Sequence, residues 1–129
     1  MPEKKSVMLI GLKPSVVDFS SPEFANSPGL GADKIQAGLD KAADDIKRLG
    51  YDIEMCLTDA GDTAADVVRC RLREKQFDCI IIGAGIRVVA AHFLLFEKLI
   101  NVVHESAPQA KICFNTTPSD SPEAVQRWI

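Results

Sequence analysis

An uninterrupted apolar run from Cys79 to Ile82 ends abruptly at Gly83-Ala84-Gly85. Apolar residues at consecutive positions are typical of a strand that is covered on both faces, as in the parallel sheets of α/β proteins. The run from Val7 to Leu12 has the same lack of alternation. Two such strands predict a parallel sheet of which they form the centre, and they argue against a sheet with one face open to water.

Segments with helical spacing alternate with the strand candidates along the chain. The clearest is 32–49, where Ile35, Leu39, Ala42 and Ile46 fall on one stripe of a helix. We expect strands over 7–12, 51–57, 78–82 and 111–114, and helices over 32–49, 63–75, 87–106 and from 121 onward. Helical crossovers between successive strands make the sheet parallel.

The character of the strands predicts their order in the sheet. The first and third are continuously apolar and belong in the centre, whereas the second and fourth are more mixed and belong at the edges. The expected fold class is α/β: one domain over residues 1–129 with a three-layer, doubly wound, Rossmann-like sheet of four parallel strands in the order 2-1-3-4. This order is flavodoxin-like, with a long loop over 13–31 between the first strand and the first helix.

Part of the chain resembles the receiver domains of response regulators. The similar stretches lie between Ala32 and Ile86, namely Leu49 to Met55, Thr58 to Asp62, and Phe77 to Ile82. The resemblance implies a flavodoxin-like fold. The chain is also similar to small uncharacterised bacterial proteins that share stretches such as Val16 to Pro22 and Leu94 to Ile100, and this resemblance implies no activity.

The receiver-like stretches lack the residues that receivers use for phosphorylation. Gly83-Ala84 stand where a receiver carries its phosphorylated aspartate, and Gly11-Leu12-Lys13 stand where it carries an acidic pair. A fifth strand with its lysine is absent as well. Phosphate transfer through an aspartate is therefore not expected.

Four connections should meet at the carboxyl ends of the parallel strands, where ligands bind in open α/β sheets. They cover 11–14, 58–62, 83–87 and 115–120. Free amides at Gly83 and Gly85 together with the Arg87 guanidinium suit a phosphate or carboxylate. We expect Lys13, Asn115 and Thr116 to complete this anion site. The alternatives are a tight turn with a solvated or ion-paired arginine, and polar turns at 115–117.

The loop over 13–31 is expected to be an ordered loop or lid over the same edge of the sheet. Asp18 is a candidate acid or base within it, although a turn-forming aspartate is the alternative. The glycines at 29 and 31 fit loop and helix-cap positions, and an anion contact is the alternative for them.

Composition limits the partners. The net charge is −3, which argues against nucleic-acid binding. The glycine pattern at 83–88 lacks the third glycine of a dinucleotide fingerprint, so no cofactor is expected. His, Cys and acidic residues do not cluster with metal-ligand spacing, so no metal is expected.

The four cysteines form no CxxC pair, and Cys56, Cys79 and Cys113 lie in apolar runs, which fits buried thiols in a reducing cytoplasm. No stretch has the length of a membrane span. We therefore expect a cytoplasmic protein without a membrane partner.

The segment near 88–103 carries more apolar residues than one sheet-facing stripe needs. This surplus predicts a homo-oligomer, with burial under the long loop as the alternative. Two functions follow from the sequence: a protein that binds an anionic small molecule at the strand ends, or a non-catalytic, receiver-like interaction module that acts as a homodimer. Whether the protein is an enzyme stays open.

Overall fold

Four strands form a single parallel sheet in a computed structural model that describes residues 4–20, 22–24, 29–59, 61 and 63–129. The strands are β1 Ser6–Leu12, β2 Asp52–Thr58, β3 Cys79–Ile82 and β4 Lys111–Phe114. Their order is β2-β1-β3-β4, and every neighbouring pair is parallel. The predicted order 2-1-3-4 is therefore confirmed, with the two continuously apolar strands at the centre.

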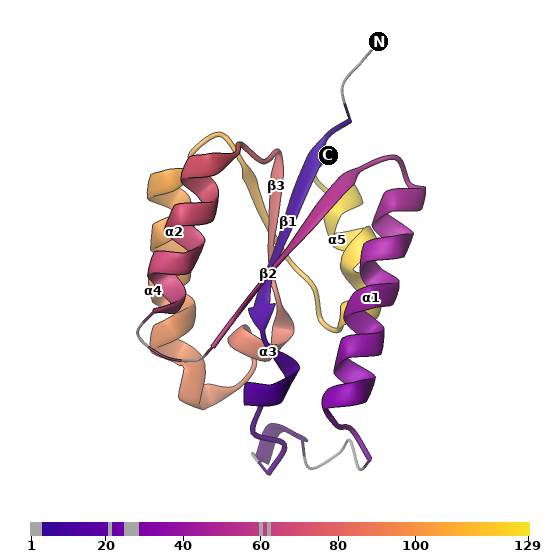
Figure 1. Ribbon diagram of the computed structural model, residues 1–129, viewed down its shortest axis with the longest axis vertical. Coiled ribbons are helices and arrows are strands. Elements are labelled where there is room, and N and C mark those ends of the chain that lie inside the picture. Colours follow the sequence, from indigo (N-terminus) through magenta and orange to yellow (C-terminus); the bar gives the residue numbers. More distant parts are fainter. Residues whose placement is uncertain (1–3, 21, 25–28, 60, 62) are drawn as a thin grey trace.

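Helices cover both faces of the sheet (Figure 1). On one face lie α1 Ala32–Arg48 and α5 Ser121–Gln126, and on the other lie α2 Ala64–Glu74 and α4 Phe93–Ser106. The short helix α3 Ala84–Arg87 and the described residues of the loop 13–31 lie at the carboxyl end of the strands. Short 3₁₀ turns are η1 Pro14–Val16, η2 Pro22–Phe24, η3 Ala90–His92 and η4 Pro118–Asp120.

Strand β1 separates two hydrophobic cores. Val7 and Leu9 pack in the core beneath α1 and α5, whereas Met8 and Ile10 pack in the core beneath α2 and α4. All four side chains are fully buried. The lack of alternation in the sequence thus has its expected cause, because each face of the strand meets a helical layer.

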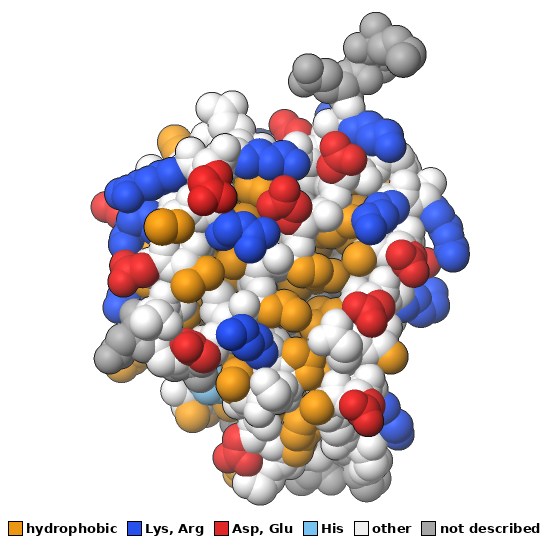
Figure 2. Space-filling model, viewed as in Figure 1, with side chains coloured by type: hydrophobic (Ala, Val, Ile, Leu, Met, Phe, Trp, Pro, Cys, Tyr) orange, Lys and Arg blue, Asp and Glu red, His pale blue; other side chains and the backbone are white. Residues whose placement is uncertain are grey.

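The β2 edge of the sheet faces the viewer in Figures 1 and 2. Apolar side chains gather along the middle of this face, and charged side chains lie toward its margins (Figure 2). From α2, Arg71 donates one hydrogen bond to the Glu54 carboxylate at 3.1 Å and one to the Met55 carbonyl at 3.3 Å. Strand pairing with another chain needs free backbone groups, and Arg71 occupies one of them on β2, the Met55 carbonyl.

One predicted helix is wrong in its extent. The segment 87–106 was expected to be continuous, but α3 ends at Arg87 and α4 begins at Phe93. Val89 between them has extended backbone angles and a buried side chain. The chain therefore leaves the helical conformation at a buried valine, a residue type of lower helix propensity than alanine or leucine.

Candidate functional site

A pocket of about 350 Å³ lies at the carboxyl ends of β1 and β3, beneath the loop 13–31. We call it the strand-end pocket. Its walls come from β1, the loop 13–31, α1, the β3–α3 turn and the segment 115–118 after β4. Strands β1 and β3 are adjacent, and the chain leaves them toward opposite faces of the sheet. The pocket therefore occupies the topological switch point, where open α/β sheets bind ligands.

The loop supplies one apolar wall of the pocket. Val17, Phe24 and Leu30 line it, and the Phe24 ring lies against the Phe19 ring with centroids 5.5 Å apart. A loop over 13–31 that covers the strand ends was expected, and its described residues do so. Residues 21 and 25–28 of this loop lie outside the part of the chain that the structure describes.

The sheet and α1 supply a second apolar wall. Leu9 and Leu12 come from β1, whereas Ile35 and Leu39 come from the first two turns of α1. Ile35 and Leu39 belong to the predicted helical stripe, so the same pattern that packs α1 on the sheet also lines the pocket.

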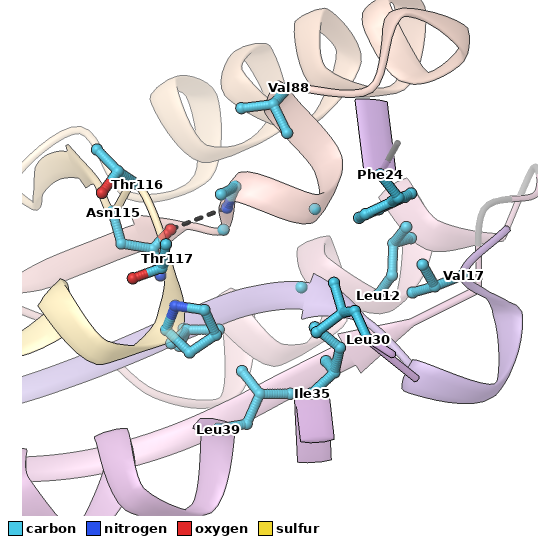
Figure 3. A pocket seen from close by; sticks show the side chains of 16 residues that line it. Leu12, Val17, Phe24, Leu30, Ile35, Leu39, Val88, Asn115, Thr116 and Thr117 are labelled. Carbon is cyan, nitrogen blue, oxygen red and sulfur yellow. Dashed lines mark hydrogen bonds between the residues drawn. The ribbon is translucent and has the colours of Figure 1, made fainter. Parts of the chain in front are cut away.

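The polar end of the strand-end pocket is formed by Asn115, Thr116 and Thr117, opposite the apolar side chains of the loop (Figure 3). Asn115 is only 2% exposed, and its side chain is engaged by the protein itself. Its Oδ1 accepts a hydrogen bond from the Ala84 N–H at 2.8 Å, and its Nδ2 donates to the Ser121 hydroxyl at 2.9 Å. Asn115 therefore fixes the β3–α3 turn and α5 to the end of β4.

Thr116 and Thr117 are exposed and form a hydrogen-bonded turn with Asp120. The Thr116 N–H donates to Asp120 at 2.9 Å and the Thr117 N–H at 3.3 Å, and the Thr116 hydroxyl donates to the same carboxylate. Burial alone would raise the pKa of Asp120, but these hydrogen bonds outweigh it and hold the pKa below its usual value. The polar turn proposed as an alternative at 115–117 is present.

The two glycines of the β3–α3 turn differ in what surrounds them. A Cβ at Gly83 would lie 3.2 Å from the Ile10 carbonyl oxygen, a tight contact that requires the backbone of β1 to move slightly. A Cβ at Gly85 would meet no heavy atom within 4 Å. Gly83 is thus required by close approach of β1, whereas Gly85 leaves open space at the pocket wall.

Arg87 lies outside the lining of the strand-end pocket. Its guanidinium donates to the Asn115 carbonyl and lies over the Phe114 ring, 5.5 Å from the centroid. Its Nε is buried and has no hydrogen-bond partner among the described residues. The structure thus places the guanidinium behind the pocket wall, where it braces the end of β4.

Two further predicted site residues lie on the loop, away from the pocket lining. Lys13 is exposed, and its backbone N–H donates to the Thr58 carbonyl at 2.8 Å. Asp18 is exposed and accepts from the Ser20 hydroxyl at 2.5 Å and from the Ser20 N–H at 3.0 Å. These bonds lower the pKa of Asp18, the hydroxyl contact most of all. Asp18 has the geometry of a turn-forming aspartate, which was the alternative role.

Of the predicted anion-site residues, the pocket lining therefore brings together Gly83, Gly85, Asn115 and Thr116 but includes neither Lys13 nor Arg87. The predicted rim segment 58–62 includes Ala60 and Asp62, which lie outside the described residues. No charged side chain is among those found to line the pocket within the described part of the chain.

The apolar lining residues of the loop were missed by the sequence analysis. Their signal was present, because Val17, Phe24 and Leu30 are large apolar residues in a segment otherwise rich in serine, proline and glycine. Such residues in a long connection need a surface to cover, and the strand ends are the nearest one.

The described residues contain no group of three or more His, Cys, Asp and Glu side chains placed to hold a metal ion. None of the described helices combines the length and the apolar character that crossing a membrane requires. The chain matches no family model, and a search of curated proteins finds none with significant similarity.

Proposed function

We propose that the protein binds a small molecule bearing a carboxylate or phosphate group in the strand-end pocket. The observation that carries the proposal is the pocket itself: about 350 Å³ at the switch point of the sheet, within the range of small-molecule sites. Its mixed lining also fits, since most ligand sites combine apolar walls with a few placed polar groups.

Within this proposal the anionic group lies at the polar end, beside Thr116, Thr117 and the Gly85 backbone. The Gly85 N–H has no acceptor among the hydrogen bonds of the described residues. The ligand body lies beneath the loop 13–31.

We also propose that the sheet belongs to the flavodoxin-like, receiver-like group, because its strand order agrees with that group. We propose further that the protein is cytoplasmic, because its four cysteines are free thiols.

A thermal-shift screen of carboxylated and phosphorylated metabolites tests the proposal. A Gly85→Leu variant places a new side chain at the open pocket wall, and an Ala37→Leu variant adds the same side chain on the exposed surface of α1. Ligands that raise the melting temperature of the wild type and of Ala37→Leu, but not of Gly85→Leu, support binding in the pocket. Equal shifts in all three proteins would place binding elsewhere and contradict the proposal.

An exposed apolar patch supports the second candidate function, a homodimeric interaction module. Val88, Phe93 and Leu94 surround the break between α3 and α4 and are 48%, 61% and 73% exposed. Leu95, Phe96 and Ile100 pack against the core instead, so the surplus of apolar residues seen in the sequence is concentrated in these three. Exposed apolar groups of this kind mark interaction sites.

The oligomeric state tests this second function. We expect the wild type to elute as a dimer in size-exclusion chromatography with light scattering at high micromolar concentration. Leu94→Lys places a charge in the patch and should yield the monomer, whereas Val67→Lys, at an exposed valine of α2, should leave the dimer intact. A wild type that is monomeric at every concentration contradicts the homodimer.

A further inference from the structure

The strand-end pocket is divided into a polar end and an apolar end, and this division says what kind of molecule it accommodates. Asn115, Thr116 and Thr117 lie together at one end, whereas Leu12, Val17 and Phe24 lie at the other (Figure 3). A ligand that fills the pocket has to present matching ends, because an apolar wall offers no hydrogen bonds to a polar group placed against it.

Solvent reaches the two ends differently. Thr116 and Thr117 are exposed, so a polar head beside them keeps part of its hydration. Leu9, Leu12 and Leu39 are buried, and Val17, Phe24 and Leu30 are half-buried. A ligand body beneath the loop is therefore removed from water, and each buried methylene adds to its affinity.

The charged side chains near the polar end of the pocket limit the charge that the ligand's head group can carry. No Lys, Arg or His side chain is found in the described lining, and the Asp120 carboxylate is bonded to Thr116 and Thr117. A phosphate monoester carries close to two negative charges at neutral pH, whereas a carboxylate carries one. With no cation in the described lining and the Asp120 carboxylate beside the threonines, each negative charge on the head is unfavourable, so among anionic heads the one with the lower charge is favoured.

We infer that the ligand is a small amphiphile with an aliphatic or aromatic body and a single carboxylate head, rather than a phosphorylated metabolite. The anionic nature of the head rests on the proposed function, whereas the apolar body and the limit of one charge follow from the pocket lining. The body lies beneath Val17, Phe24 and Leu30, and the carboxylate lies beside Thr116 and Thr117.

Titrations of the full-length ¹⁵N-labelled protein, followed by ¹H–¹⁵N NMR, test this inference with acetate, butyrate, hexanoate, hexyl phosphate and hexanol as probes. Hexanoate is expected to bind most tightly, with affinity rising about fourfold for each methylene that becomes buried. The largest shifts are expected at the amides of Gly85, Leu30 and Thr116. Hexyl phosphate is expected to bind at least tenfold more weakly than hexanoate.

Two variants check the location. Leu30→Ser removes part of the apolar wall and should weaken hexanoate but not acetate, whereas Leu49→Ser, at an exposed leucine outside the pocket lining, should change neither. Gly85→Leu should abolish saturable binding of hexanoate. Because Leu30 is only half-buried and Gly85 faces open space, both proteins are expected to keep the dispersion of the wild-type spectrum.

Different results would contradict the proposed anion site and the inferred amphiphilic ligand. Equal affinity for acetate and hexanoate, or tighter binding of hexyl phosphate, would overturn the apolar, singly charged ligand and leave the proposed anion site standing. Equal affinity for hexanol and hexanoate would overturn the anionic head and leave the apolar body standing. Absence of saturable binding by every probe would overturn both.

Discussion

Asn115 connects three segments through a single side chain. Its side-chain amide accepts a hydrogen bond from the Ala84 N–H at 2.8 Å and donates one to the Ser121 hydroxyl at 2.9 Å. The backbone carbonyl of Asn115 also accepts a hydrogen bond from Arg87. Removal of the amide leaves the buried Ser121 hydroxyl and the partly buried Ala84 N–H without this partner. We expect Asn115→Ala to lower the free energy of unfolding by about 2–4 kcal/mol, since each unpaired buried group costs about 1–3 kcal/mol.

Urea denaturation measures this change, and Asn101→Ala serves as the control. Asn101 is exposed on α4 and donates to the Glu97 carbonyl of its own helix. Its removal should change the free energy of unfolding by less than about 0.5 kcal/mol. Similar values for the two variants would show that the amide of Asn115 is not a structural connection.

The two glycines of the β3–α3 turn give opposite predictions. Gly83→Ala should lower the free energy of unfolding by about 1–3 kcal/mol, because its Cβ would lie 3.2 Å from a backbone oxygen of β1. Gly85→Ala should raise it by about 0.4–1 kcal/mol, because the alanine restricts the unfolded chain and meets nothing in the fold. Thermal unfolding of both variants checks the signs, and a stabilising Gly83→Ala would refute the close approach.

At the scale of elements, the connection from β4 to α5 depends on an ionised Asp120. The pKa of Asp120 is lowered in the fold because hydrogen bonds from Thr116 and Thr117 outweigh its burial. The stability it contributes is therefore present above the pKa of an unfolded-chain aspartate, about 3.9, and is lost as the pH falls through the lower folded-state pKa.

We expect the stability difference between wild type and Asp120→Asn to be constant above about pH 5 and to shrink as the pH falls below about 4. Urea midpoints measured from pH 7 to pH 2 test this. Asp44→Asn, on the exposed surface of α1, provides the control and should show no comparable loss. A difference that grows as the pH falls would mean that the fold does not favour the ionised carboxylate.

Elements were predictable where one local pattern decides them. The continuous apolar runs identified β1 and β3 and their central place, and the stripe of α1 identified its inner face. The break at Val88 to His92 was not predictable, because no glycine or proline marks it and a buried Val89 decides it. Helix propensity is a weak signal when tertiary burial acts against it.

At the scale of the whole molecule, both cores are closed to solvent. Cys56 lies in the core beneath α2 and α4, whereas Cys79 and Cys113 lie in the core beneath α1 and α5 with their sulfurs 3.4 Å apart. Burial raises the pKa of Cys56. The hydrogen bond that Cys79 and Cys113 share raises the pKa of Cys113, with burial adding to it, and lowers the pKa of Cys79. All three thiols are buried, so they are shielded from reagents in solution.

We expect only Cys70, which is exposed on α2, to react rapidly with a thiol reagent such as dithionitrobenzoate in the native protein. The other three should react only after unfolding, which releases both cores together. Cys70→Ser should remove the rapid phase. A second thiol that reacts rapidly in native Cys70→Ser would show that one helical layer opens independently.

The location of the candidate site followed from the topology, because parallel strands with the order 2-1-3-4 bring 83–87 and 115–120 to one end. The roles of individual residues did not follow. Arg87 and Asn115 were predicted to contact a ligand, and the structure shows hydrogen bonds by which they also connect protein segments to one another. The hydrogen-bond partners of these two side chains depend on where three loops end in space, and no local pattern in the sequence predicts that.

The amide of Asn115 also has an evolutionary consequence. One of its partners is a backbone N–H that every residue type except proline supplies at position 84, whereas the other is the hydroxyl of Ser121, which few residue types can replace. Substitutions at 115 and 121 are therefore expected to occur together in diverging sequences, and position 84 should vary independently of them. Position 85, which faces open space, could then change to alter the ligand while the fold stays intact.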